Sequence, residues 1–256
     1  MLKIAASRTV SRVCGAFLDS SLSKPLISVF VKNCGIDLSD YESDGFGCFN
    51  DCFTRKIKEG KRPLPQCEDA FMSPCDGLLS INTVTNGTVL PIKQSEYTIP
   101  QLLGGDAIAE KYQNGLCLVF RLCVDHYHRY SYIDNGTKGE NMFIPGVLHT
   151  VRPIALAACP VFVQNCREYT VMHTDHFGDV TQVEVGAMLV GKIKNHHGAG
   201  PMQRGTEKGM FLYGGSTVVL LLEKDRVHLD PKLLEAAQSG NEVPVRMGEV
   251  LGKAAQ

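Results

Sequence analysis

The spacing of hydrophobic positions changes near residue 60 and divides the chain into two parts. In the first part, apolar residues recur at close to the helical period, at Leu18, Leu22, Leu26 and Phe30. Pro25 can begin a second helix, because proline is favoured in a first turn. An acidic, turn-prone break over 37–44 precedes a short amphipathic segment, Cys48 to Lys58. We therefore expect residues 1–60 to form an N-terminal helical segment.

From Phe71 onward the pattern is typical of strands and turns. Apolar stretches over 78–84 and 88–92 flank Asn86-Gly87, which predicts a β-hairpin. Nearly continuous apolar runs predict buried strands at 116–124 and 217–222. The pattern alternates over 179–193, where Gly186 and Gly191 suggest a bend or a close backbone approach.

The last part of the chain predicts a short helix at 233–237 and a final strand pair within 242–250. The expected fold class is α+β: a β-rich core domain over residues 61–256, preceded by the helical segment.

The charge balance argues against nucleic acid as a partner. The formal net charge is −1, so no overall field attracts the chain to phosphates. A local basic cluster leaves two interpretations open, a solvated loop or contact with anionic lipid headgroups: Arg55, Lys56, Lys58, Lys61 and Arg62. No apolar run approaches the roughly 20 residues that a membrane-spanning helix needs. The basic N-terminus could suit a transit peptide or a surface helix, although a plain helical hairpin is favoured.

Ten cysteines raise the question of metal binding or disulfides. None forms a CxxC pair, and Cys48 and Cys52 lack a second pair or a nearby histidine at zinc-finger spacing, so we expect no metal site. A chain of 256 residues can bury a core without disulfides. We therefore expect reduced, mostly buried cysteines in a cytoplasmic protein.

Candidate chemistry lies where Gly214-Gly215-Ser216 precedes the apolar strand at 217–222. Glycine permits the strained backbone in which a hydroxyl can attack its own preceding carbonyl. The resulting ester at Gly215–Ser216 would undergo β-elimination, and hydrolysis of the dehydroalanine would leave a pyruvoyl group and ammonia. Taken alone, this tripeptide is most often just a tight turn.

Six ordered segments extend the argument beyond this tripeptide. They are Phe49–Pro63 (FNDCFTRKIKEGKRP), Ser73–Gly77 (SPCDG), Arg121–Gly136 (RLCVDHYHRYSYIDNG), Gly146–Leu156 (GVLHTVRPIAL), Gly178–Ile193 and Arg204–Thr217 (RGTEKGMFLYGGST). Together they resemble the phosphatidylserine decarboxylase family, whose members cut themselves and use a pyruvoyl group.

The resemblance implies roles for individual residues. Ser216 would become the covalent pyruvoyl cofactor, Gly215 would end the large chain, and Asp76 would orient a histidine that takes the Ser216 proton. The products, residues 1–215 and 216–256, would stay associated. The mature enzyme would convert phosphatidylserine to phosphatidylethanolamine and CO2 through a Schiff base on the pyruvoyl group.

The same resemblance implies where the protein works and with what. Its residues 1–60 would contact the inner face of the cell membrane peripherally, and a homodimer is plausible.

The chain departs from the family in the segment around His128. That residue matches the first of two family histidines, but the second, which the resemblance assigns as the base, is replaced by Ser131. His126 stands where the family has an aspartate. A serine is no base near neutral pH, so three alternatives remain: His128 performs both roles, His149 replaces the missing base, or the chain processes poorly.

Arg152 is a second departure, since the family usually has asparagine there. Its guanidinium could bind a substrate carboxylate or phosphate in two-point fashion, or could be an exposed charge. This departure, the altered histidine segment and the short N-terminus leave two further functions open. One is a soluble pyruvoyl-dependent decarboxylase of a free amino acid. The other is an unprocessed, non-catalytic relative.

Overall fold

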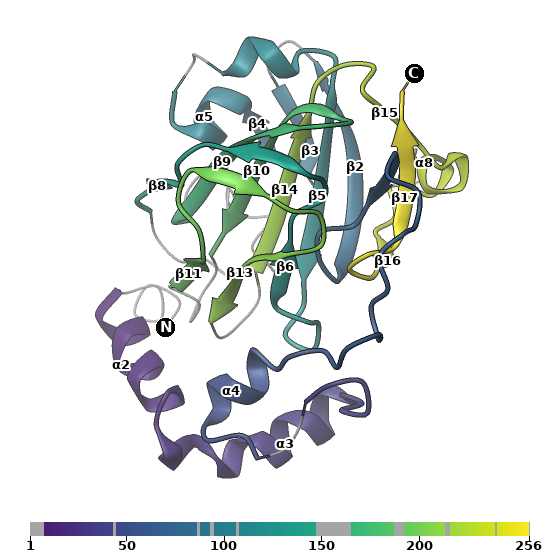
Figure 1. Cartoon of the computed structure of the whole chain (residues 1–256). Helices are drawn as coiled ribbons and strands as arrows, with labels where there is room; N and C mark the ends of the chain where they lie inside the picture. The colour runs from purple at the N-terminus through teal and green to yellow at the C-terminus, as the bar shows by residue number, and fades with distance from the viewer. Residues whose placement is uncertain are drawn as a thin grey trace.

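Helices form the N-terminal end of the chain, and the strands follow (Figure 1). The computed structural model describes residues 8–42, 45–85, 88–92, 95–105, 108–146, 165–186, 192–212, 216–238 and 240–255. The first elements are α2 (Arg8–Leu18), the 3-10 helix η1 (Ser21–Ser23), α3 (Pro25–Cys34) and α4 (Phe49–Phe53). No helix in these ranges has the length and apolar character needed to cross a bilayer.

Helix boundaries follow local chemistry. α3 begins at Pro25, as the sequence predicts, and ends where Gly35 adopts a φ of 63°. The amphipathic segment at 48–58 contains only the short helix α4, after which the backbone returns to an extended course.

An eleven-stranded sheet forms the core of the fold. Its order is β12-β7-β9-β10-β14-β5-β2-β3-β4, with β16 paired to β2 and β8 to β9. The strands are β2 (Gly77–Thr85), β3 (Thr88–Ile92), β4 (Ser95–Thr98), β5 (Leu116–Leu122), β7 (Gly136–Lys138), β8 (Met142–Ile144), β9 (Arg167–Thr174), β10 (Gly178–Val185), β12 (Gly200–Met202), β14 (Ser216–Leu222) and β16 (Val243–Val245). An α+β fold, rich in strands, is confirmed.

Two three-stranded sheets and short helices complete the architecture. One sheet has the order β1-β17-β15 and the other β11-β13-β6. Their bounds are β1 (Ala70–Met72), β6 (Arg129–Ser131), β11 (Lys192–Asn195), β13 (Glu207–Leu212), β15 (Val227–Leu229) and β17 (Val250–Ala254). The helices are α5 (Ile99–Leu103), η2 (Ala109–Tyr112) and α8 (Pro231–Gln238).

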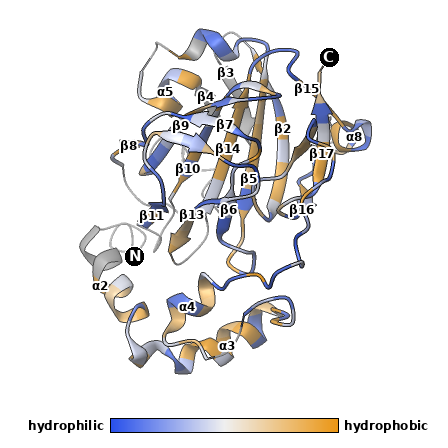
Figure 2. Ribbon diagram, in the orientation of Figure 1, coloured by the Kyte–Doolittle hydropathy of each residue, from blue (hydrophilic) through white to orange (hydrophobic). Residues whose placement is uncertain are grey.

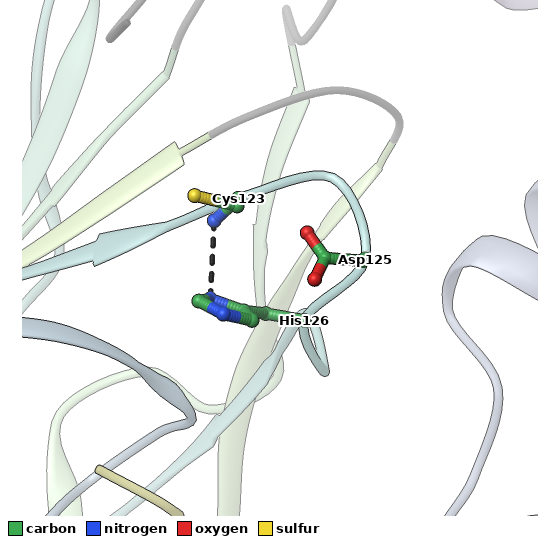
Figure 3. A group of neighbouring side chains, drawn as sticks. All are labelled: Cys123, Asp125 and His126. Carbon is green, nitrogen blue, oxygen red and sulfur yellow. Dashed lines mark hydrogen bonds between the residues drawn. The ribbon is translucent and has the colours of Figure 1, made fainter. Parts of the chain in front are cut away.

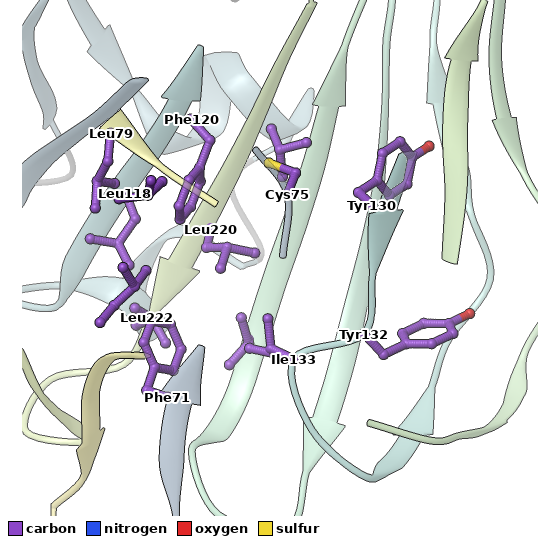
Figure 4. Packing of buried hydrophobic residues seen from close by; sticks show 14 of the residues in the cluster. Phe71, Cys75, Leu79, Leu118, Phe120, Tyr130, Tyr132, Ile133, Leu220 and Leu222 are labelled. Carbon is purple, nitrogen blue, oxygen red and sulfur yellow. The ribbon is translucent and has the colours of Figure 1, made fainter. Parts of the chain in front are cut away.

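The strand β14 is buried on both of its faces. Its residues alternate between two core clusters, with Leu220 in the cluster that contains Phe211 of β13, and Leu221 in the cluster that contains Leu102 of α5. The first cluster, part of which Figure 4 shows, lies between the central sheet and the small sheets. The hydropathy colouring of Figure 2 shows the same concentration of apolar residues along the central strands. This two-sided burial explains why the sequence reads as a continuous apolar run.

A fully buried ion pair joins β13 to the central sheet. Lys208 Nζ lies 2.7 Å from Glu184 Oε1 of β10 and 2.9 Å from Asn195 Oδ1 of β11. Neither charged side chain is exposed. Removing one partner of such a pair typically costs about 3–5 kcal/mol, because the other charge remains buried. The pair therefore fixes β13, which ends four residues before Ser216.

Several strand predictions are confirmed, and one pairing is wrong. β2 and β3 pair at Val84 with Val89, as expected of the hairpin, although its turn at 86–87 lies outside the described residues. β5, β14 and α8 match their predicted positions. The final strands do not pair with each other, because β16 pairs with β2 and β17 with β1 and β15.

The basic cluster at 55–62 is divided between surface and interior. Lys56, Lys58 and Lys61 are exposed, but Arg55 is 2% exposed and the side chain of Arg62 is 11% exposed. Arg55 donates to the carbonyls of Asp125 and His126 and lies 4.5 Å from the centre of the Tyr41 ring. Both arginines therefore make internal contacts, and the three lysines are the members of the cluster that stay exposed.

Candidate active site

The first residues of β2 and β14 lie at the same edge of the central sheet. Both strands pair antiparallel with β5 and flank it, so they run parallel to each other. Ser216 pairs with Leu122, the last residue of β5, and Leu78 pairs with Arg121 beside it. Asp76, immediately before β2, is therefore about 10 Å from Ser216 along this edge, the width of two strand spacings.

Ser216 has an unusual environment for a hydroxyl group. The residue is fully buried, and the alternation along β14 places its side chain on the face of Leu220, in the direction of the core cluster that contains Phe211. Its Oγ has no hydrogen-bond partner among the residues that the structure describes. A buried polar atom without a partner costs free energy and calls for an explanation, and a reactive role is one of the few available.

The carboxylate of Asp76 has a separate donor for each oxygen. The backbone N–H of Met247 donates to Oδ1 at 2.8 Å, and Arg62 Nη2 lies 3.4 Å from Oδ2. The side chains of Asp76 and Arg62 are 12% and 11% exposed, so this ion pair is shielded from water. The orientation of the Asp76 carboxylate is therefore held from both sides.

His128 is fully buried beside β13. Its Nδ1 lies 2.9 Å from the carbonyl oxygen of His126, and its ring centre lies 4.0 Å from that of Phe53. Because a carbonyl oxygen only accepts, Nδ1 carries the proton, and in the neutral ring Nε2 is the basic nitrogen. The His128 carbonyl accepts from the N–H of Phe211, which places this histidine against the end of β13.

Ser131 stands where the family resemblance implies a second histidine. Its N–H and its Oγ both lie near the carbonyl oxygen of Pro74, at 2.9 and 3.4 Å. The residue lines a cavity of about 220 Å³ together with Arg62 and Met247, the two residues that hold Asp76. Ser131 therefore lies near the two residues that bind Asp76, but it offers only a hydroxyl group there.

A larger cavity of about 560 Å³ is also lined by Arg62. Asp76 and His126 both line it, and so do Arg55 and Arg246. Residues of the N-terminal segment, such as Asp40, also line this cavity. This cavity is large enough for a small polar headgroup.

His126 closes the turn that follows β5. Its backbone N–H donates to the Cys123 carbonyl at 3.0 Å, and its Nδ1 accepts the Cys123 N–H at 3.1 Å (Figure 3). An aspartate at this position could accept the same N–H, so the substitution keeps an acceptor in the turn. Cys123, Asp125 and His126 also bring sulfur, oxygen and nitrogen atoms within 4.8 Å of one another. The lone pair of His126 Nδ1 already accepts the Cys123 N–H, so this nitrogen is not free to bind a metal ion.

The acceptor role of His126 predicts a pH effect on stability. Burial lowers the pKa of His126 below its usual 6.5. The unfolded state then binds the proton more readily, so stability is complete above about pH 6.5 and falls as the pH drops toward the folded-state pKa. We expect thermal unfolding of His126→Asn, which keeps an acceptor, to lose less stability than the native chain between about pH 7 and pH 5.

The control for this comparison is His228→Asn, because His228 is exposed on β15. It should keep the native dependence on pH. An unchanged slope in His126→Asn would contradict the assigned role of His126.

Three of the expected site residues lie outside the described residues, namely Gly215, His149 and Arg152. Among the others, the sheet edge brings Asp76 near Ser216, and β13 connects His128 to the same region. Sequence reasoning missed Arg62 as a partner of Asp76, since it grouped this arginine with the surface lysines. Its position directly before Pro63 in a family motif is the signal that could have found it.

Nine cysteines are described, and no disulfide joins any two of them. Five of them are buried and Cys67 is exposed. Burial of five of the nine agrees with the expectation that the cysteines are mostly buried, and their reduced state stays a prediction.

Comparison with known proteins identifies the family to which the chain is similar. A sequence model described as phosphatidylserine decarboxylase matches residues 49–253. The chain is 41% identical over 254 residues to phosphatidylserine decarboxylase proenzyme 2 of Clostridium acetobutylicum, covering 99% of this chain and 87% of that protein. It is 39% identical to a phosphatidylserine decarboxylase proenzyme of Clostridium botulinum, covering 94% and 84%, and 37% identical to one of Clostridium tetani, covering 98% and 86%.

Proposed function

The chain belongs to the phosphatidylserine decarboxylase family, and we propose that it converts phosphatidylserine to phosphatidylethanolamine and CO2 after cutting itself before Ser216. It is a carboxy-lyase, and its relatives are named proenzymes, which implies a processed chain. One observation carries the proposal: Ser216 Oγ is buried without a partner among the described residues, at the sheet edge that also holds Asp76.

Self-cleavage begins with transfer of the Ser216 hydroxyl proton to a base. The oxygen attacks the Gly215 carbonyl carbon, and the amide becomes an ester as the nitrogen takes a proton. Loss of the Cα proton of residue 216 then expels the Gly215 carboxylate and leaves dehydroalanine. Water hydrolyses this residue to a pyruvoyl group and releases ammonia, so the products are residues 1–215 and a second chain that begins at position 216.

His128 is our candidate for the base. Its proton on Nδ1 is held by the His126 carbonyl, so the basic Nε2 is the atom that can take up a proton. Its contact with the end of β13 supports a location near the bond to be cut. His149 is the alternative base.

The surroundings of Ser216 fit a pyruvoyl group. The ketone oxygen would replace the Ser216 hydroxyl oxygen, which makes no hydrogen bond to a described residue. The pyruvoyl group supplies an electrophilic carbonyl that takes up the substrate amine and accepts electrons as CO2 leaves. The chain's own residues would exclude water around this carbonyl, through the apolar cluster beside Leu220, and His128 would hold or return protons.

An exposed apolar face on the N-terminal helices supports contact with a lipid surface. Five large hydrophobic side chains of α2, η1 and α3 are exposed, from 41% to 75%: Val13, Phe17, Leu22, Leu26 and Val29. Lys24 and Lys32 are exposed on the same helical segment. An amphipathic surface of this kind binds the interface of anionic membranes, so the segment would lie at the inner face of the cell membrane. Arg152 remains a candidate for binding the substrate carboxylate or phosphate.

We expect the purified enzyme to release CO2 from phosphatidylserine in vesicles and not from free amino acids. The variant Leu22→Glu/Leu26→Glu should reduce vesicle co-sedimentation and lipid turnover together, because it places charges on the apolar face. Leu64→Glu is the matched control, since Leu64 is exposed at 46% outside the helices. Turnover of free amino acids without turnover of the lipid would favour the soluble decarboxylase instead.

A further inference from the structure

Arg62 lies between two carboxylates that belong to different parts of the chain. Its Nη2 is 3.4 Å from Asp76 Oδ2, at the start of the central sheet, and its Nη1 is 3.8 Å from Asp40 Oδ2 in the N-terminal segment. Nη1 also donates to the Lys61 carbonyl at 3.1 Å, which holds the guanidinium in place.

This arginine lines both cavities of the site. It lines the large cavity together with Asp76 and His126, and the small cavity together with Ser131. Ser131 carries no charge and is turned toward Pro74. Among the described residues, Arg62 is the cation that forms an ion pair with Asp76.

We propose that Arg62 is a positioning residue for self-cleavage, which supplies the fixed positive charge that orients the Asp76 carboxylate. The inference rests on the proposed function, in which Asp76 orients the base that activates Ser216. A guanidinium suits this task because it stays charged and its donors lie in a rigid plane. The Met247 N–H occupies the other carboxylate oxygen, so loss of Arg62 would leave Asp76 with a single donor among the described residues.

The test measures self-cleavage of the full chain after cell-free synthesis, as the appearance of the small chain on denaturing gels. We expect Arg62→Gln, which removes the charge and keeps most of the volume, to slow cleavage about tenfold to hundredfold, because hydrogen bonds to charged groups are the strong ones. Arg62→Lys, which restores a positive charge, should recover part of the rate. Lys61→Ala is the matched control: Lys61 is the adjacent residue, pairs with Asp40 at 3.0 Å and should leave cleavage unchanged.

Chemical rescue distinguishes positioning from a structural role. Purified, uncut Arg62→Ala should resume cleavage when guanidinium ion is added at millimolar concentration, because the ion can enter the space beside Asp76. The melting temperature of each variant shows whether it has folded. Native-like cleavage in folded Arg62→Gln would overturn the proposal, as would a slow rate that neither lysine nor guanidinium restores. A native chain that stays uncut would contradict the proposed function itself, before any Arg62 variant is compared.

Discussion

Ser216→Ala is expected to accumulate as a single uncut chain of 28.0 kDa without decarboxylase activity. The change deletes one buried oxygen that has no hydrogen-bond partner among the described residues, so the fold should lose little stability. Without the hydroxyl there is no intramolecular attack on the Gly215 carbonyl, and no pyruvoyl group can form. The loss of activity should therefore be complete rather than partial.

Denaturing mass spectrometry measures this outcome directly. The native chain should give residues 1–215 and a second chain of 41 residues, the difference between 256 and 215. Thr217→Val is the matched control, because Thr217 is also buried on β14 with an Oγ1 that has no partner in the described part of the chain. It should cut and turn over normally. A native chain that remains whole would instead favour the non-catalytic relative.

Replacement of His128 is expected to stop both maturation and turnover. General acid–base catalysis by a positioned side chain typically contributes about 10² to 10⁴ in rate, and we propose that His128 serves both stages. His128→Gln keeps a donor for the His126 carbonyl and much of the volume against Phe53, so folding should survive. The uncut chain should persist for at least about a hundredfold longer than the native one.

The comparison variant is His149→Gln. If His128 performs both roles, His149→Gln should cut at the native rate. Loss of cutting in His149→Gln together with normal cutting in His128→Gln would assign the base to His149. Melting temperatures of both variants separate loss of chemistry from loss of fold.

Elements whose signals are local in the sequence could be predicted. Pro25 begins α3, and the apolar stretches over 78–84 and 88–92 form β2 and β3, because helix starts and tight hairpins depend on neighbouring residues. The pairing of β16 with β2 could not be predicted, since it joins residues more than 160 positions apart and leaves no local signal. The order of strands around β14 was inaccessible for the same reason.

The candidate site divides in a similar way. Asp76, His128 and Ser216 stand in motifs, so the family resemblance was enough to select them. The contact of Arg62 with Asp76, and the donor from Met247, arise only when β2, β16 and the segment before Pro63 come together. Arg55 was placed wrongly for a different reason, because its charge suggested an exposed position. Its side chain is buried and donates to carbonyls of the turn after β5.

The central position of β14 gives maturation a direction. This strand pairs with β5 on one side and with β10 on the other, and the proposed cut releases it as the start of a separate chain. Before the cut, refolding is unimolecular and independent of protein concentration. After the cut, the short chain must associate with the large chain in a bimolecular step, which costs translational freedom. After denaturation and dilution, the mature enzyme should therefore regain a much smaller fraction of its native structure than Ser216→Ala does. The mature enzyme would then persist because it unfolds slowly, and not because the folded state is favoured at equilibrium.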